Sequence, residues 1–447
     1  MVNLYQRNNL LDKQPKTVIT KDDFEIFFSA KEYLQQLLTL IDSATTRIYL
    51  TVLYLEDDEV GRLIVEHLIN AKQRHPELDI KVFVDFHRAR RGLYGQNDSD
   101  GNAGFYQKTD LAYPDFIKFY GVAVKHREVF GVLHLKGMVF DDQLFYTGAS
   151  INNIYLHFQQ KYRYDRYSLI KSKPLADSFA SLLNDRLVNS PCVYLFNRQP
   201  VVVDKNFKRQ VAKQRKLLAR TDYELTDCGQ ADLTITPLIG LGKRSNKLNK
   251  VIEQQILSTQ ENLVLYTPYF NLPAVLKRAV AKLLKNGKHV EIVIGDKHAS
   301  DFFIPADQPF RKIGLIPYLY EGGLRAFIKK HQKSIDDNRL VIRLWQHQSN
   351  SFHLKGVTID NRYHLLTGNN LNPRAWRLDL ENGLLIDDKK GQLSEMFAQE
   401  HQQILTHTRE IKHWQDIDTE QDYPKAVQLW LKRLHRTKLD KLFQQYM

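Results

Sequence analysis

Cysteine and long apolar runs are almost missing from this sequence. Its 447 residues include two cysteines, Cys192 and Cys228, which cannot build a disulfide framework and lack the paired spacing of a zinc site. We therefore expect a reducing compartment and no bound metal. No run comes near the ~18 apolar residues that predict a membrane-spanning helix, and the N-terminal residues lack the apolar core of a secretion signal. A soluble chain is the expectation.

Positive charge is in excess, with 64 Lys and Arg against 51 Asp and Glu, a formal net charge of +13. The 43% of hydrophobic residues is typical of a globular protein with a sizeable core. A basic chain of this kind favours polyanionic partners, either nucleic acid or an anionic membrane surface. A solvated basic surface without a specific partner explains the charge equally simply.

The main feature of the sequence is an internal repeat. Residues 131–152 and 350–372 both contain His-Leu-Lys-Gly, followed by an aspartate, a glycine and an asparagine at matching positions 219 or 220 residues apart. Further downstream, Asp165 aligns with Glu381. The matched pairs are His134 and His353, Lys136 and Lys355, Asp141 and Asp360, Gly148 and Gly368, and Asn152 and Asn372.

Each copy of the repeat reads as strand, helix, strand, variable loop, hairpin, helix and strand. This order predicts an α/β fold of two halves related by pseudo-twofold symmetry, each a mixed β-sheet flanked by helices. The basic run 205–220 is compatible with a helix, and the amphipathic C-terminus either lies on an anionic membrane or packs on the second half. The predicted units are a first half (1–200), a basic connecting segment (201–235), a second half (236–410) and a basic amphipathic C-terminal segment (411–447).

Strand parity separates the motif residues into two groups. On a strand, side chains two residues apart share a face, so His134 and Lys136 point the same way. Asp141 lies an odd step further on, at an Asp-Asp turn, where we expect it to fix the turn or to bridge to a neighbour. The second copy has the same parity. The candidate catalytic residues are His134, Lys136, Asp141, His353, Lys355 and Asp360.

Two histidines and two lysines that converge across a pseudo-twofold axis suit a phosphoryl centre. One neutral imidazole attacks phosphorus, the other protonates the leaving oxygen, and the lysines stabilise the equatorial charge. Asp165 and Glu381 are the candidates for holding the second ring nitrogen of each histidine. Asn152 and Asn372, near predicted helix starts, are candidates for binding an anion. A zinc site is disfavoured because a lysine beside each histidine would repel the cation.

The pattern HxKxxxxD with its following Gly and Asn, present twice, resembles the phospholipase D superfamily over about 24–407. Within that superfamily, the segments 162–167, 236–243 and 367–382 resemble the bacterial phosphatidylserine synthases of the Gram-negative type. The resemblance implies two phospholipase D-like halves. It also implies transfer of a phosphatidyl group from CDP-diacylglycerol to L-serine, with release of CMP, through a phosphatidyl-histidine and without a cofactor.

Carried over to matching positions, the resemblance makes His134 the nucleophile and His353 the general acid, later the base. The phosphate would be held by both lysines and by Asn152 and Asn372, while Asp165 and Glu381 would orient the imidazoles. The first copy reads Gly-Ala-Ser and the second Gly-Asn-Asn after the hairpin, which leaves open the side chain that donates at that corner.

Arginines near the motifs are candidates for binding a carboxylate or the pyrophosphate of the donor, although surface ion pairs explain each of them as well. The expected partners are CDP-diacylglycerol, L-serine and an anionic membrane surface, for a cytoplasmic protein on the inner face of the membrane, with no specific nucleic acid. Two alternatives remain open: a phospholipase D-type nuclease or phosphodiesterase, and a non-catalytic anionic-lipid binder. The candidate substrate-binding arginines are Arg88, Arg163, Arg166, Arg374 and Arg377.

Overall fold

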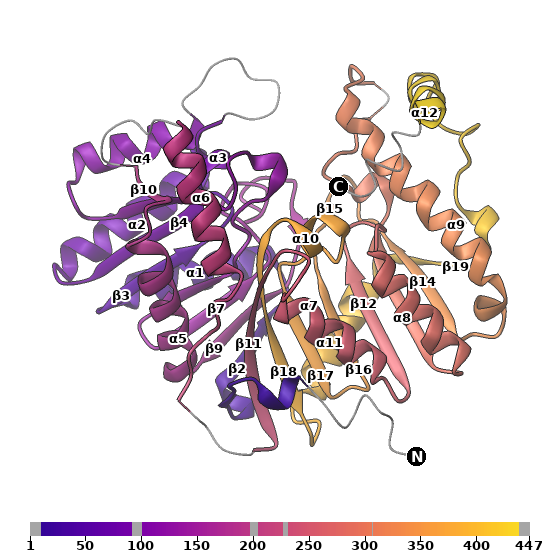
Figure 1. Ribbon diagram of the computed structural model, residues 1–447, viewed down its shortest axis with the longest axis horizontal. Coiled ribbons are helices and arrows are strands. Elements are labelled where there is room, and N and C mark those ends of the chain that lie inside the picture. Colours follow the sequence, from indigo (N-terminus) through magenta and orange to yellow (C-terminus); the bar gives the residue numbers. More distant parts are fainter. Residues whose placement is uncertain (1–9, 92–100, 197–203, 227–230, 306, 438–447) are drawn as a thin grey trace.

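The chain folds into two mixed β-sheets that stand side by side, each with its own helices (Figure 1). The computed structural model describes residues 10–91, 101–196, 204–226, 231–305 and 307–437. Three sequence features lie outside the described residues: Cys228, the predicted boundary at residue 200, and the last ten residues of the predicted C-terminal segment.

The first sheet has eight strands in the order β10-β5-β4-β3-β6-β7-β9-β2. Its centre is parallel, because β3 pairs with β4 and β4 with β5 in the same direction, while the remaining pairs are antiparallel. The strands are β2 (Phe24–Phe27), β3 (Arg47–Thr51), β4 (Asp79–Asp85), β5 (Lys118–Val122), β6 (Gly137–Phe140), β7 (Gln143–Thr147), β9 (Tyr167–Lys171) and β10 (Val193–Leu195).

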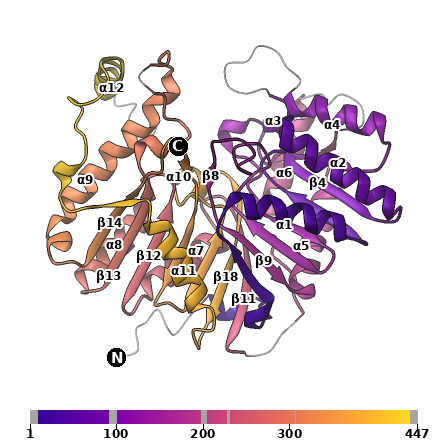
Figure 2. The same ribbon diagram turned by 180° about the vertical axis from the view of Figure 1, so that it is seen from behind.

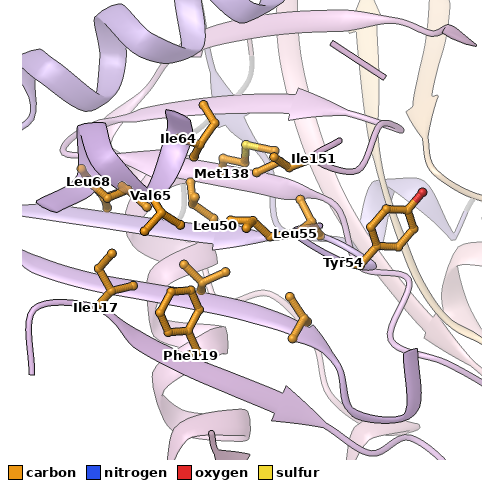
Figure 3. Close-up of a cluster of buried hydrophobic side chains, with 14 of the residues drawn as sticks. Leu50, Tyr54, Leu55, Ile64, Val65, Leu68, Ile117, Phe119, Met138 and Ile151 are labelled. Carbon is orange, nitrogen blue, oxygen red and sulfur yellow. The ribbon is translucent and has the colours of Figure 1, made fainter. Parts of the chain in front are cut away.

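Amphipathic helices cover this sheet. In α2, the side chain of Asp58 accepts the amide hydrogen of Gly61 and starts the helix, and the apolar stripe that includes Ile64 and Leu68 packs in one core with Leu50 of β3 (Figure 3). The helices of this half are α1 (Ala30–Ser43), α2 (Glu59–Arg74), α3 (Phe86–Ala89), α4 (Gly101–Ala112) and α5 (Lys173–Leu183).

The second sheet has nine strands in the order β1-β11-β18-β17-β16-β12-β13-β14-β19. Its helices are α7 (Lys247–Leu257), α8 (Ala274–Lys285), α9 (Ile316–Asp336), α10 (Pro373–Arg377) and α11 (Ser394–Leu405). Its strands are β1 (Thr17–Val18), β11 (Leu233–Leu241), β12 (Asn262–Thr267), β13 (His289–Gly295), β14 (Leu340–Trp345), β16 (Gly356–Ile359), β17 (Tyr363–Thr367), β18 (Leu380–Asp388) and β19 (Thr408–Ile411).

Two strands cross the predicted unit boundaries. The N-terminal strand β1 pairs with β11 and therefore belongs to the second sheet, although it lies within the predicted first half. The strand β11 begins at Leu233, before the predicted start of the second half at 236. Hydrophobic periodicity does not reveal such a crossing, because the partner of a two-residue edge strand is set by long-range contacts.

The two halves share a core. One apolar cluster contains Val139 and Tyr146 of the first sheet together with Ile239 of β11 and Leu384 of β18. Figure 2 shows the same two sheets from behind, with α11 in front of the second one. The fold is thus α/β with two halves, each a mixed sheet flanked by helices, as the sequence predicts.

The basic run 205–220 contains α6 (Lys205–Leu218), which packs on the first half through Phe207 and Val211. At the other end of the chain, α12 (Lys425–Thr437) buries Val427 and Leu431 against Leu315, before α9. The described part of the C-terminal segment is therefore packed on the second half. Among the described residues, no helix combines the length and the apolarity that crossing a membrane requires.

Candidate active site

His134 of the first half is oriented by the second half. Leu133 forms an isolated bridge with Leu380, and the amide of His134 donates to the carbonyl oxygen of Leu380 at 2.9 Å. The next residue after Leu380 is Glu381, whose Oε2 lies 2.9 Å from Nδ1 of His134. The backbone bridge therefore sets the register that brings this carboxyl group to the imidazole.

The relationship is repeated with the halves exchanged. The short strands β8 (Arg163–Tyr164) and β15 (Ser351–Phe352) pair in parallel, and the amide of His353 donates to the carbonyl oxygen of Tyr164 at 2.8 Å. This places Oδ2 of Asp165 2.7 Å from Nδ1 of His353. Each imidazole thus has its Nδ1 held by a carboxyl group from the opposite half, which leaves Nε2 as the reactive nitrogen.

Burial keeps both imidazoles neutral at pH 7. His134 is 8% and His353 7% exposed, and the two lysines are 1% exposed each. Burial, with Lys136 and Lys355 adding, lowers the pKa of His134 well below its ordinary value. Burial and then Lys355 lower the pKa of His353 to about 4. A neutral imidazole is the form that attacks phosphorus, so this environment favours a nucleophile.

The lysines are affected in the same direction. Burial, and then the neighbouring ammonium of Lys355, lowers the pKa of Lys136 to about 7. The pKa of Lys355 is also lowered by burial, although Asp165 opposes the shift from 3.3 Å. Two buried ammonium groups close together repel one another, and an anion placed between them would relieve that repulsion. The site is therefore suited to a phosphate group.

The pKa values of the two orienting carboxyl groups are shifted in opposite directions. Burial raises the pKa of Glu381 well above its ordinary value, and Asp379 adds to the shift. Burial opposes the ionisation of Asp165 too, but Lys355 and His353 outweigh it and lower the pKa of Asp165. At neutral pH the partner of His353 is consequently an anion, whereas burial favours the neutral acid form of the partner of His134. An anionic partner stabilises an imidazolium, so His353 is the better proton carrier.

A tyrosine completes the asymmetry. The hydroxyl of Tyr155 lies 3.1 Å from Nε2 of His353, and the two rings meet edge to face at 5.1 Å. Among the described residues, Nε2 of His134 has no hydrogen-bond partner. The sequence analysis missed Tyr155, because its counterpart in the repeat is Ala375 and only the tyrosine's place beside a motif could have drawn attention to it.

Both motif glycines allow close approach to the site. A Cβ atom on Gly148 would lie 2.8 Å from the carboxylate oxygens of Asp165, and one on Gly368 would lie 2.6 Å from the side chain of Lys136. Real Cβ atoms do not make such contacts. The glycines in the repeated motif thus leave room for Asp165 and Lys136.

The asparagines cap local turns. The side-chain oxygen of Asn152 accepts the amide hydrogen of Tyr155, and its Nδ2 donates to Oε2 of Glu56, both at 2.9 Å. Asn372 caps α10, with its side-chain oxygen accepting the amide hydrogen of Ala375 at 2.9 Å. Their contact with a phosphate stays a prediction.

Asp141 and Asp360 do not belong with the reacting groups. Asp141 accepts amide hydrogens from Thr46 at 2.8 Å and Arg47 at 3.0 Å, and Asp360 accepts those of Glu261 and its two neighbours in the chain. Both have positive φ, 48° and 53°, which aspartate tolerates in turns. Each lies one strand-length beyond its lysine, about 16 Å along the strand. Their grouping with the catalytic residues is corrected, and the turn-fixing role expected from parity agrees with these contacts.

Two of the candidate arginines are engaged in structural contacts. Arg166 forms a buried two-point ion pair with Glu400 of α11, at 2.7 and 2.5 Å. Arg374 donates to the carbonyl oxygens of Val129 at 3.3 Å and Glu128 at 2.9 Å. Nε and Nη2 of Arg166 are already paired with a carboxylate from the other half, which argues against its predicted role in substrate binding.

The other three candidates differ in what surrounds them. Arg163 lies 2.7 Å from Asp301 and its guanidinium stacks 4.7 Å over the ring of Tyr155. Arg377 is partly exposed at the end of α10. The guanidinium of Arg88 lies 4.3 Å over the ring of a tyrosine and has no ion-pair or hydrogen-bond partner in the described part of the chain.

Comparison with known proteins places this geometry in a family. The model of the PLD-like domain of cardiolipin synthase matches residues 37–186 and 252–406, the two halves in turn. The CDP-diacylglycerol–serine O-phosphatidyltransferases of Haemophilus influenzae and Escherichia coli are 46% and 41% identical to the chain. The first alignment covers 97% of this chain and 96% of the relative, and the second covers 99% of each.

A solved structure supports the same relationship. The crystal structure of phosphatidylserine synthase from Haemophilus influenzae superposes with a TM-score of 0.96 at 44% identity, covering 100% of both chains. The family-model match spans more than half of the sequence, and the relatives match it from end to end. The chain belongs to the phospholipase D superfamily and, within it, to the family of bacterial phosphatidylserine synthases.

Proposed function

We propose that the chain transfers a phosphatidyl group from CDP-diacylglycerol to L-serine and releases CMP. The observation that carries the proposal is the pair of buried imidazoles, each held through Nδ1 by a carboxyl group of the opposite half. The full-length similarity to transferases of this name supports the choice of donor and acceptor.

In the first step, Nε2 of His134 attacks the phosphorus bound to the diacylglycerol oxygen, and the bond from that phosphorus to the CMP oxygen breaks. His353 supplies a proton to the departing CMP. Lys136 and Lys355 hold the phosphate oxygens and stabilise the charge that develops on them. The negative substrate also favours the protonated form of His353, which is a minor form in the free protein.

In the second step, His353 works as a base. Its Nε2 takes the proton of the serine hydroxyl, the serine oxygen bonds to phosphorus, and the bond from phosphorus to His134 breaks. The ionised Asp165 suits His353 to these proton transfers, because it stabilises the imidazolium formed in each turnover. The raised pKa of Glu381 favours its neutral form, which suits a histidine that stays uncharged until it attacks.

We also propose that the protein works on the inner face of the cell membrane without a spanning helix. A lipid donor requires access to a bilayer, and α12 offers exposed Leu429, 60% accessible, next to basic residues. The cationic groups of Lys312 and Arg433 lie over the ring of Trp430, 4.9 and 5.2 Å from its centroid. Apolar contact and attraction of Lys and Arg to anionic lipids add in such a helix.

The test is a direct assay. Purified protein is incubated with CDP-diacylglycerol in mixed micelles, with and without L-serine, and both CMP and the lipid product are followed. We expect serine-dependent phosphatidylserine formation, abolished by His134→Ala and by His353→Ala. A preparation that leaves the liponucleotide intact and cleaves nucleic acid would overturn the proposal in favour of a nuclease.

A further inference from the structure

Arg88 is a buried cation that lacks a hydrogen-bond or ion-pair partner for its side chain within the described residues. It lies in α3, directly after the parallel strand β4, and is 7% exposed. Its guanidinium stacks on Tyr54, and within the described residues its side chain makes no hydrogen bond or ion pair. Buried arginines are nearly always paired, and ligands of open α/β sheets bind beyond the carboxyl ends of the strands. An unpaired guanidinium in this place points to an anionic ligand.

The carboxyl group of Glu56 lies near the hydroxyl of Tyr54. Figure 3 shows this tyrosine at the end of the apolar cluster, with its hydroxyl turned away from the other side chains. The hydroxyl is 3.4 Å from Nδ2 of Asn152, which in turn lies 2.9 Å from Oε2 of Glu56. Arg88 and Glu56 thus share one aromatic neighbour, and among the described ion pairs they form none with each other. A ligand with both charges could satisfy the two groups.

This pair is connected to the His353 side of the active site. The side-chain oxygen of Asn152 accepts the amide hydrogen of Tyr155, whose hydroxyl contacts Nε2 of His353. The neighbouring cation, Arg163, is already paired with an aspartate, whereas Arg88 has no ion-pair partner among the described residues.

We propose that Arg88 and Glu56 form the subsite for the zwitterionic amino-acid acceptor. Arg88 binds the α-carboxylate, Glu56 binds the α-ammonium, and the acceptor hydroxyl reaches Nε2 of His353 beside Tyr155. The proposal rests on the function proposed above and assigns the residues that give it acceptor specificity. The hydroxyl proton passes to His353, the oxygen bonds to phosphorus, and the electron pair of the broken P–N bond returns to His134.

The chemistry of displacement supports this location. The acceptor must enter from the side opposite the nucleophile, where the CMP oxygen has left, and that side is served by His353. A site that pairs both charged groups of an amino acid also disfavours water, which can make neither contact. A polar site that is built to bind its substrate rejects analogues because its own buried groups are left unpaired.

The experiment separates the donor reaction from the acceptor reaction. Exchange of labelled CMP into CDP-diacylglycerol, measured without serine, reports the donor half, and kcat/KM for L-serine reports the whole transfer. We expect Arg88→Met and Glu56→Gln to lower kcat/KM for serine about tenfold or more beyond any loss in exchange. Arg88→Lys, which keeps the charge, should lose less than Arg88→Met. Arg90→Met and Glu66→Gln, both at exposed positions, are the matched controls and should leave both rates unaltered.

Serine analogues assign the two contacts separately. Ethanolamine has the ammonium without the carboxylate, and 3-hydroxypropionate has the carboxylate without the ammonium. Both analogues should compete with serine. Inhibition by ethanolamine should weaken mainly in Glu56→Gln, and inhibition by 3-hydroxypropionate should weaken mainly in Arg88→Met.

Two results overturn the subsite while the transferase function stands. One is an equal loss of CMP exchange and serine transfer in Arg88→Met, which would place Arg88 on the donor pyrophosphate. The other is an unaltered KM for serine in both variants. A wild-type protein that exchanges CMP but makes no phosphatidylserine would instead refute the proposed function, and the subsite with it.

Discussion

Nδ1 of His134 lies 2.9 Å from Oε2 of Glu381, a residue 247 positions away in the other half of the chain. The same exchange joins His353 to Asp165 across 188 positions. Each half therefore supplies one reacting imidazole and the group that orients the imidazole of its partner. The single composite site requires both halves, and the duplicated sequence has diverged at these carboxyl groups into an aspartate whose pKa is lowered and a glutamate whose pKa is raised.

The first prediction uses this difference between the two pKa shifts. The raised pKa of Glu381 favours its neutral acid form, which Glu381→Gln resembles in charge and shape, and we expect kcat to fall by about tenfold or less. Asp165 is ionised, and Asp165→Asn removes the anion that supports the imidazolium of His353, so kcat should fall about 10²- to 10⁴-fold. Each isosteric amide is the control for the other. Steady-state kinetics at saturating substrates would contradict the assignment if the two losses were equal.

The second prediction concerns Tyr155. Its hydroxyl contacts Nε2 of His353, and a donor there stabilises the neutral imidazole. We expect Tyr155→Phe to move the acid limb of the kcat profile toward higher pH, because the pKa of His353 rises when the donor is lost, and to lower kcat by about tenfold.

The matched control is Tyr162→Phe. The hydroxyl of Tyr162 also contacts an imidazole, that of His347, at 2.7 Å, but neither residue belongs to the reacting group. If the acid limb of the kcat profile shifted equally in Tyr155→Phe and Tyr162→Phe, the shift would be due to general destabilisation and not to the Tyr155 contact.

The third prediction is an alkaline limit set by Lys136. The pKa of this lysine is lowered to about 7, so in the free enzyme its positive charge is present below that pH and lost above it. Because kcat/KM reports the ionisation of the free enzyme, its value for CDP-diacylglycerol should fall as the pH rises through about 7. In Lys136→Arg the arginine keeps its charge at all these pH values, so the variant should lose the alkaline fall in kcat/KM, whatever its activity at the optimum. An unaltered limb in this variant would assign the ionisation to another group.

The sequence predicts the reacting groups better than their partners. Strand parity within a repeated motif identifies His134, Lys136 and their counterparts, because local backbone geometry decides the direction of a side chain. It also predicts that Asp141 belongs to a turn. The assignment of Glu381 to His134 depends on a bridge between Leu133 and Leu380, and the sequence contains no local signal for a contact at that separation.

The arginines show the same limit. Arg163 and Arg166 are three residues apart and both lie near the motif. Arg163 stacks on the active-site tyrosine, whereas Arg166 forms an ion pair with Glu400 from the opposite half. Tyr155 was missed for a different reason, because its counterpart in the second copy of the repeat is an alanine, so the repeat does not mark this position as functional. Local pattern therefore predicts the symmetric part of the site, and long-range packing decides the rest.

The last prediction separates stability from catalysis at Asp141. Partial burial opposes its charge, but the hydroxyl of Thr46 and three backbone amides outweigh burial and lower the pKa of Asp141 to about 2. A lowered carboxyl pKa stabilises the fold above its ordinary value near 4, and this contribution is lost as the pH falls toward 2. We expect Asp141→Asn to lower the free energy of unfolding at pH 7 by about 1–3 kcal/mol, because the amide replaces an anion that accepts several N–H groups.

Activity should respond differently from stability. At temperatures well below the transition, kcat of the folded Asp141→Asn protein should stay within about twofold of the wild type, since the side chain of Asp141 bonds, among the described residues, to Thr45, Thr46 and Arg47 at the start of β3. The difference in stability between the two proteins should shrink as the pH is lowered from 5 to 3, where the wild-type carboxylate loses its advantage. Thermal unfolding followed by circular dichroism across that range measures the trend, and a loss of kcat by 10²-fold or more in the folded variant would return Asp141 to the catalytic group.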